Sequence, residues 1–230
     1  MNVAENVSRV RRAIETACTL AVRRPSDVTI VAVTKYVGAE RVKAVLAGGI
    51  DHLAENRREG LLAKQDALPG VSATWHLIGT LQTRKVKDVV NRIDFFHALD
   101  SLKLAGEIEK RLTKEHLRCF IQLNISGEKS KHGIEPAELD GFLSGLTAYP
   151  RIKIVGLMTM APNTSDGNQI RAVFRRLREL RDVVRDRQLA FAPCTELSMG
   201  MSHDYPIAVE EGATFVRIGT ALVGDERQDV

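Results

Sequence analysis

The residue best suited to covalent chemistry is Lys35, which ends the apolar run VTIVAVTK at 28–35. A run rich in Val and Ile predicts a strand buried on both faces of a parallel sheet. In α/β folds the carboxyl ends of such strands carry the functional groups, and a primary amine there can form a Schiff base with an aldehyde or ketone. Taken alone, the run favours a simpler interpretation, a lysine that reaches solvent and pairs with a carboxylate. The rest of the chain reverses that preference.

Small and hydroxyl-bearing residues follow two later predicted strands. They are Ser198, Gly200 and Ser202 in ELSMGMS, and Gly219 and Thr220 in VRIGTALVG. Backbone N–H groups in such turns can bind a dianion, and the loops after strands seven and eight of a β/α-barrel are a recurrent phosphate site. Tight turns with a capping serine would use the same residues. Two such turns side by side, opposite a strand-end lysine, favour the phosphate site.

Arg217 lies within the last of these strands and is expected to point inward with Gly219, because alternate strand residues share a face. An inward arginine needs an anion or an acceptor, since it cannot shed its charge. A Schiff-base lysine, a phosphate site and this arginine together fit pyridoxal 5′-phosphate (PLP). Lys35 would then hold its C4′ atom and Arg217 would face its pyridine nitrogen, an arrangement that weakens the ring as an electron sink.

Strands and helices alternate along the chain, and eight strands can be counted. The expected strands are 28–35, 52–56, 75–79, 94–99, 118–125, 151–160, 196–199 and 215–220. The expected helices are 2–22, 39–47, one ending near 65, 82–90, one from 101 to about 115, 137–147, 168–187 and 204–211. Right-handed crossovers between eight parallel strands predict an α/β protein, a (β/α)₈ TIM barrel. An open doubly wound sheet is the alternative, but no GxGxxG follows the first strand.

The helix at 2–22 is then an additional N-terminal element, expected to cover the bottom of the barrel or the gap after strand eight. Too few residues follow Thr220 for a full eighth helix. We expect residues 1–230 to form a single PLP-binding domain, because neither a linker nor a composition shift interrupts the chain.

Composition limits the possible partners and location. The net charge of +4 is too small to indicate nucleic acid, and no apolar run is long enough for a membrane span. The N-terminus lacks the apolar segment of a signal peptide, and three cysteines without CxxC spacing favour a reducing cytoplasm. The histidines lack metal-ligand spacing, so no metal is expected; His76 should shape the pocket and His97 should be structural. The chain has no heptad stripe that would indicate an oligomer, so a monomer is expected.

Seven motifs recur in a family order: VAVTK, AENR, WHLIGTLQTRK, LNISGEKSKHG, GLMTMAP, LSMGMSHDY and EEGATFVRIGTALVG. On these motifs the chain resembles, from about residue 5 to 224, the pyridoxal phosphate homeostasis proteins, relatives of the barrel half of bacterial alanine racemase. The resemblance implies a Schiff base between PLP and Lys35. It further implies Ser198, Gly219 and Thr220 at the phosphate, and Asn56, Met199 and Arg217 beside the ring. Gly200 and His76 complete the candidate site.

Three residues depart from the family pattern: Ala54 where glycine is common, Tyr36 where small or polar residues are usual, and Thr80 in place of a proline. None is expected to touch PLP directly. Tyr36 should point to the side of the strand opposite Lys35.

The chemistry leaves three functions open. A PLP racemase needs two bases, and the racemase relatives take the second from a tyrosine of a further domain. We therefore expect a PLP-binding protein of PLP homeostasis that supplies the cofactor to apo PLP-dependent enzymes, with amino-acid racemase as the alternative. A cofactor-free Schiff-base aldolase ranks lower, and it would need Asp100 or Glu55 as the acid–base group.

Two basic segments have no assigned role. Lys129 and Lys131 could be solvent lysines or could attract an anionic cofactor. The arginines of the helix at 168–187 are expected to be a solvated face with weak ion pairs.

Overall fold

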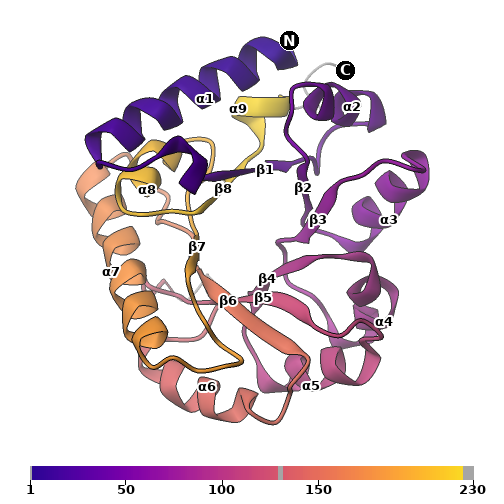
Figure 1. Cartoon of the computed structure of the whole chain (residues 1–230), viewed down its shortest axis with the longest axis vertical. Coiled ribbons are helices and arrows are strands. Elements are labelled where there is room, and N and C mark those ends of the chain that lie inside the picture. Colours follow the sequence, from indigo (N-terminus) through magenta and orange to yellow (C-terminus); the bar gives the residue numbers. More distant parts are fainter. Residues whose placement is uncertain (1, 129–131, 225–230) are drawn as a thin grey trace.

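Eight parallel strands close into a barrel in chain order, and β8 pairs back to β1 with Ile30 beside Val216 and Val31 beside Arg217 (Figure 1). The computed structural model describes residues 2–128 and 132–224. The strands are β1 Thr29–Val33, β2 His52–Glu55, β3 Thr74–Leu77, β4 Phe95–Leu99, β5 Leu117–Gln122, β6 Ile152–Met158, β7 Glu196–Ser198 and β8 Phe215–Ile218. The predicted TIM barrel is confirmed, and Lys129 and Lys131 fall outside the described residues.

Helices surround the barrel on its outside (Figure 1). They are α1 Val3–Leu20, α2 Ala39–Ala47, α3 Arg58–Ala67, α4 Val86–Val89, α5 Leu102–Arg111, α6 Leu139–Leu146, α7 Gly167–Asp186, α8 Tyr205–Glu210 and α9 Thr220–Val223. Short 3₁₀ turns are η1 Pro25–Asp27, η2 Thr83–Lys85, η3 Val90–Arg92 and η4 Pro136–Glu138. None of the helices in the described parts of the chain is both long and apolar enough to cross a membrane.

Two helix predictions were wrong in detail. The single helix expected at 82–90 is divided into η2, α4 and η3, because the β-branched Val86, Val89 and Val90 are all buried and have low helix propensity. The helix expected at 137–147 starts as η4 at Pro136, and α6 follows from Leu139. Several strands also end earlier than expected, because the chain turns into the loops that form the mouth of the barrel.

The N-terminal helix α1 fills the gap left after β8. Asn2 caps it by accepting from the backbone N–H groups of Ala4 and Glu5. Its apolar face packs against α8, α9 and α2, and the Asn6 amide donates to Leu222 O at 3.0 Å (Figure 1). The gap, one of the two positions considered, is therefore confirmed. Within the described residues, one turn of helix, α9, follows β8.

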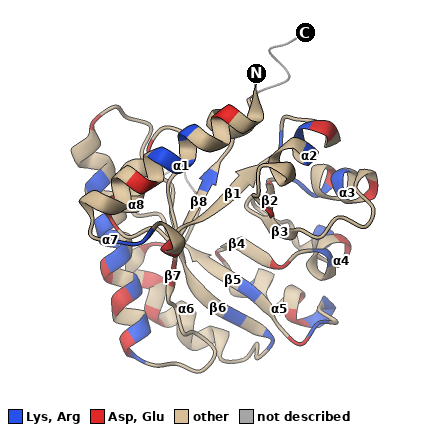
Figure 2. Cartoon of the chain, turned by 45° about the horizontal axis from the view of Figure 1, so that its top comes forward, with Lys and Arg blue, Asp and Glu red and all other residues tan. Residues whose placement is uncertain are grey.

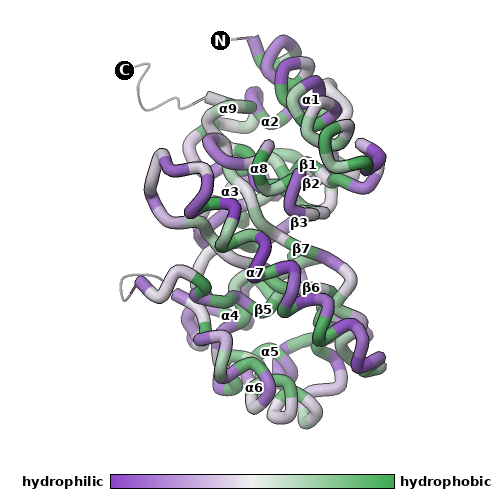
Figure 3. Tube along the Cα trace, turned by 90° about the vertical axis from the view of Figure 1, so that its left-hand side faces the viewer, coloured by the Kyte–Doolittle hydropathy of each residue, from purple (hydrophilic) through white to green (hydrophobic). Residues whose placement is uncertain are grey.

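Alternating hydrophilic and hydrophobic residues along α1 and α7 reflect helices with one face on the barrel and one in solvent (Figure 3). The apolar core runs continuously between helices and strands, and Cys18, Cys119 and Cys194 are free thiols buried in it. Burial raises the pKa of the Cys194 thiol to about 12.

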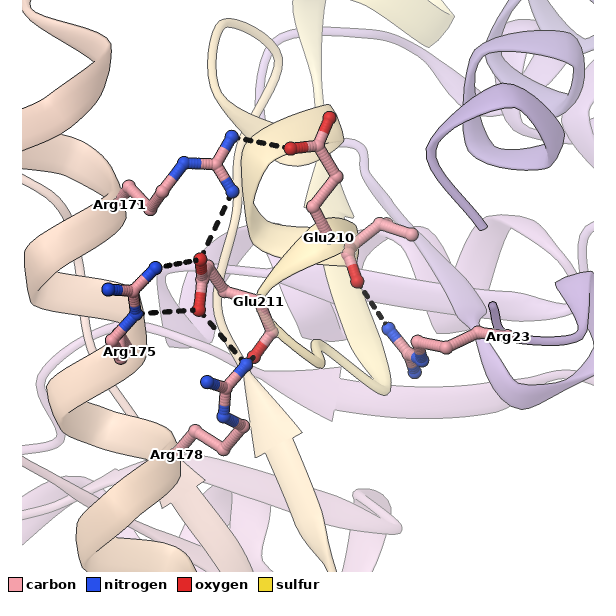
Figure 4. Close-up of polar contacts among 7 residues, drawn as sticks. Arg23, Arg171, Arg175, Arg178, Glu210 and Glu211 are labelled. Atoms are coloured by element: carbon pink, nitrogen blue, oxygen red, sulfur yellow. Dashed lines mark hydrogen bonds and ion pairs between the residues drawn. The ribbon is translucent and has the colours of Figure 1, made fainter. Parts of the chain in front are cut away.

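The arginines of α7 are interleaved with acidic residues (Figure 2). Three of these arginines form ion pairs with another element. Arg171, Arg175 and Arg178 all pair with Glu211, which follows α8 (Figure 4). The carboxylate of Glu211 is only 5% exposed. These three arginines therefore do not belong to a purely solvated face, because they join α7 to the end of α8 through a buried carboxylate.

Candidate functional site

A cavity of about 390 Å³ opens at the carboxyl ends of the strands, the end at which barrels hold their functional groups. Its volume lies in the range of roughly 300–1,000 Å³ that is typical of small-molecule sites. Of the candidate residues, it is lined by Lys35, Asn56, Arg217, Gly219 and Thr220. Two basic side chains, Lys35 and Arg217, are among the residues that line it, which suits an anionic ligand.

Lys35 stands at the mouth of the cavity, two residues beyond the end of β1. Its side chain is exposed, not buried, and its Nζ atom lies 4.6 Å from the ring centroid of Tyr36. Tyr36 also lines the cavity, so its expected position on the opposite side of the strand is wrong. The physical reason is that the extended strand has ended: Val37 N donates to Thr34 O at 3.2 Å, which closes a turn over these residues.

One end of the cavity is formed by the turns after β7 and β8. Ser202 Oγ accepts from the backbone N–H groups of Gly219 at 3.2 Å and Ala221 at 3.3 Å, and Ser202, Gly219 and Thr220 all line the cavity. The two turns predicted to lie side by side are therefore adjacent. A hydroxyl and clustered backbone N–H groups are the donors that bind a phosphate.

Arg217 forms part of the cavity floor and is only 4% exposed. Its Nη1 donates to Ser198 Oγ at 2.6 Å and its Nη2 donates to Thr159 O at 3.0 Å. Burial lowers the pKa of Arg217 to about 10, and the nearby carboxylate of Asp204 opposes that shift. The guanidinium therefore stays charged at neutral pH. The predicted inward direction of Arg217 and Gly219 is confirmed by their place on the cavity wall.

Four candidate residues lie outside the cavity lining: Ser198, Met199, Gly200 and His76. Ser198 and Met199 are fully buried, and Ser198 holds Arg217 from below. Gly200 has a φ of 92° and its carbonyl accepts from Arg217 N at 2.9 Å, so it fixes the backbone of that arginine. β7 ends at Ser198, and the chain first reaches the cavity three residues later at Met201 and Ser202.

Sequence reasoning missed several lining residues that follow other strand ends. They are Ile78, Gly79, Thr80, Gln122, His132, Met160, Met201 and His203. Thr80 and Tyr36 are two of the family departures, and both line the cavity. Gly79 could have been recognised from WHLIG: a Cβ there would lie 2.1 Å from Asn56 O, which only glycine avoids.

Comparison with known proteins assigns the chain to a family. The model of the alanine racemase N-terminal domain matches residues 3–227. A pyridoxal phosphate homeostasis protein of Aquifex aeolicus is 39% identical over 99% of this chain and 100% of its own length. The chain belongs to the pyridoxal phosphate homeostasis protein family.

Solved structures agree with that assignment. PipY of Synechococcus elongatus, solved with PLP bound, is 32% identical, with a TM-score of 0.82 over 96% of this chain and all of PipY. An alanine racemase of Clostridium difficile has a TM-score of 0.76 at 15% identity, covering 96% of this chain and 58% of the racemase. The second likeness shows a common fold alone.

The acidic residues considered for an aldolase do not reach the cavity of this homeostasis-family member. Glu55 is buried against α3, where its carboxylate meets Lys64 Nζ at 2.7 Å and accepts from Thr34 Oγ1 at 2.6 Å. Asp100 is absent from the lining, and burial raises the pKa of its carboxyl group. None of the described lining residues is Asp or Glu, and the described residues contain no cluster of three metal-ligating side chains.

Proposed function

We propose that this protein binds PLP and keeps it available to other proteins, with Lys35 as the residue that holds it covalently. The observation that carries the proposal is one cavity that combines an exposed lysine, a buried charged arginine and a turn rich in N–H and hydroxyl donors. The name of the Aquifex aeolicus relative and the PLP bound to PipY support the same assignment.

Each part of the cavity fits one part of the cofactor. Lys35 supplies an amine for the aldehyde carbon, and the hydroxyl groups of Ser202 and Thr220, on either side of Gly219, supply donors for the phosphate. Arg217 can only donate, which suits an unprotonated pyridine nitrogen. Bound PLP would supply an aldehyde that links reversibly to amines. Asn56 and Tyr36 would flank the ring, whereas Ser198, Met199, Gly200 and His76 support the floor from beneath.

A carrier role follows from the exposure of Lys35. An amine at an open cavity mouth can exchange its bound aldehyde with another amine, whereas contained chemistry favours a site closed to water. The recipients would be apo PLP-dependent enzymes that present a lysine. We further infer a single domain, a monomer and a cytoplasmic location, the last being consistent with three buried free thiols.

The test is the absorbance spectrum of the purified protein with added PLP, before and after borohydride reduction. We expect a visible band that reduction removes, and a cofactor mass retained on Lys35 after denaturation. Lys35→Ala should lose both signals, whereas Lys43→Ala, an exposed α2 lysine paired with Glu40 at 2.7 Å, should keep them. A protein that shows no band beyond that of free PLP and retains no cofactor mass after reduction would overturn the proposal.

Amino-acid racemase is the second candidate, and one observation favours it: Tyr36 lies in the cavity beside Lys35. A racemase needs bases on opposite faces of the substrate carbon. Tyr36 and Lys35 are stacked at one wall, which is a poor arrangement for that purpose. Deuterium exchange at the α-carbon of L-alanine, with Tyr36→Phe as control, separates the two functions. Racemisation that depends on Tyr36 would favour the enzyme.

A further inference from the structure

Beneath the cavity floor, five side chains from five strands form a continuous line of hydrogen bonds. Arg217 Nη1 donates to Ser198 Oγ at 2.6 Å, and Ser198 Oγ lies 2.8 Å from His97 Nδ1. His97 Nε2 lies 2.8 Å from His76 Nδ1, and His76 Nε2 lies 2.9 Å from His52 Nδ1. The line crosses the barrel interior from β8 and β7 to β4, β3 and the start of β2.

Aromatic rings enclose this line. His76 stacks on Phe95 with ring centroids 4.6 Å apart, and His97 stacks on Phe120 at 4.4 Å. Phe215 contacts both histidines edge-on or tilted. His76 and His97 have no exposed surface, so their partners must come from the protein itself. Polar groups in such surroundings are costly unless every one is hydrogen-bonded.

The far end of the line lies near solvent. His52 is half-buried and lines a second cavity, of about 340 Å³, at the amino-terminal ends of β1 and β2. The three histidines therefore extend from this lower cavity to the arginine under the upper one.

The direction of the hydrogen bonds follows from Arg217, which has donors and no acceptor. Ser198 Oγ must accept from it, and within residues 2–128 and 132–224 the other hydrogen-bond partner of that oxygen is His97 Nδ1. If His97 Nδ1 carried a proton, the buried serine proton would have no acceptor, and an unpaired buried donor is unfavourable. His97 Nδ1 therefore accepts from Ser198.

The remaining tautomers follow in turn. Burial lowers the pKa of His76 and of His97 well below the ordinary histidine value, so both rings are neutral. A neutral ring that accepts at Nδ1 carries its proton on Nε2. His97 Nε2–H then donates to His76 Nδ1, and His76 Nε2–H donates to His52 Nδ1. Ser198, His97 and His76 each accept from the arginine side and donate away from it.

We infer that His97, with His76 and His52 behind it, is a positioning residue that fixes the Arg217 guanidinium at the cavity floor through Ser198. The aligned dipoles turn their negative ends towards the buried charge and hold one guanidinium orientation. As far as Arg217 faces a cofactor, the inference rests on the proposed function. The direction of the line of hydrogen bonds does not rest on the proposed function.

The first test uses the protein without cofactor. Long-range ¹H–¹⁵N spectra of histidine-labelled protein at pH 7 should show His97 and His76 as neutral rings with the proton on Nε2. A proton on His97 Nδ1, or a doubly protonated His97, would overturn the inference. This result does not depend on whether PLP binds.

The second test compares two variants. His97→Phe keeps a ring against Phe120 but removes both nitrogens, whereas His97→Gln can still accept from Ser198 and donate to His76. We expect the Phe variant to give mixed tautomers at His76 and His52, faster exchange of the Arg217 guanidinium protons and about tenfold weaker PLP binding. The Gln variant should stay within about threefold of the wild type.

The outcomes separate the two hypotheses. If His97→Phe binds PLP as tightly as the wild type and leaves the Arg217 proton exchange unchanged, the positioning role is wrong. If it only lowers the melting temperature, His97 is a packing residue and the inference also fails. If the wild type takes up no PLP, the proposed function fails. The tautomer and exchange measurements then still decide the role of the line of hydrogen bonds. Should the Phe variant not fold, the wild-type tautomers and the Gln variant remain decisive.

Discussion

Replacing Glu211 by glutamine should show how strongly α7 and α8 are held together. Its carboxylate is 5% exposed and lies within 3.1 Å of Arg171, 3.2 Å of Arg175 and 2.9 Å of Arg178 (Figure 4). Glutamine keeps the shape but removes the charge, and its amide group would face guanidinium groups that also donate. The variant leaves three cations close together without their shared counter-charge.

Removing one partner of a buried ion pair costs about 3–5 kcal/mol. The arginines here are between 34% and 54% exposed, so water compensates for part of the loss. We therefore expect Glu211→Gln to lower the free energy of unfolding by about 2 kcal/mol. For a chain of this size that corresponds to a melting temperature roughly 4–8 °C lower.

The assay is urea unfolding followed by circular dichroism, with Glu179→Gln as the matched control. Glu179 lies on the same helix and pairs with Arg176 at 3.2 Å, but both side chains are half-exposed. The control should lose no more than about 0.5 kcal/mol. Equal losses in the two variants would refute the reasoning, because they would show that burial of Glu211 adds nothing.

Acid pH gives an independent check with a defined sign. Burial on its own raises the pKa of Glu211, but hydrogen bonds from Arg175 and Arg171 outweigh it, and the net pKa is lowered. A lowered carboxylate pKa contributes stability that is present above the unfolded-state pKa and is lost as pH falls through the folded-state pKa. The difference between wild type and Glu211→Gln should therefore be constant near neutrality and shrink below about pH 4. A difference that grows on acidification would contradict this account.

Three further outcomes are expected. Gly79→Ala should unfold the protein or abolish PLP uptake, because its Cβ would lie 2.1 Å from Asn56 O. The control Gly141→Ala has open space around it, so a thermal melt should show it to be neutral or stabilising by up to about 1 kcal/mol. Ser202→Ala should weaken PLP binding about tenfold in a fluorescence titration and leave pyridoxal, which lacks the phosphate, unaffected; equal losses would place the phosphate elsewhere. The cysteines should resist a thiol reagent at pH 8 in the native protein and react in denaturant, because all three are buried; rapid native labelling would show an opening of the core.

The barrel and the direction of Arg217 could be predicted because both depend on local periodicity. Strand and helix alternation is readable along the chain, and a period of two assigns Arg217 and Gly219 to one face. The grouping of the arginines around Glu211 could also have been predicted from the sequence. Positions 171, 175 and 178 follow the helical spacing i, i+4, i+7, so they share one face of α7.

The misplaced residues depend on where each strand stops. Tyr36 enters the cavity because β1 ends at Val33 and a turn replaces the alternation. Ser198 and Met199 lie below the cavity because β7 is only three residues long and the chain reaches the mouth at Met201. Strand ends are set by tertiary hydrogen bonds, which no single-sequence pattern records.

The histidine line depends on strand register, which is equally absent from the sequence. In a barrel, the layer at which an inward side chain sits is fixed by the stagger between neighbouring strands. His52 and His76 are offset by two positions in the β2–β3 register, where Ala54 lies beside His76. Only that offset brings His76 Nε2 to His52 Nδ1.

Arg217 connects the cavity to the core, and this explains why three histidines occupy interior strand positions that branched aliphatic residues usually fill. A fully buried guanidinium is stable only if its donors meet acceptors and its charge meets aligned dipoles. Thr159 O accepts from Nη2 directly, whereas Ser198 Oγ accepts from Nη1 and needs an acceptor for its own proton. Each histidine accepts one proton and needs an acceptor for its own on the next strand, until His52 lines the lower cavity. An apolar residue at any of these positions would leave the preceding donor unpaired, so the interior histidines are best understood as a consequence of the arginine at the cavity floor.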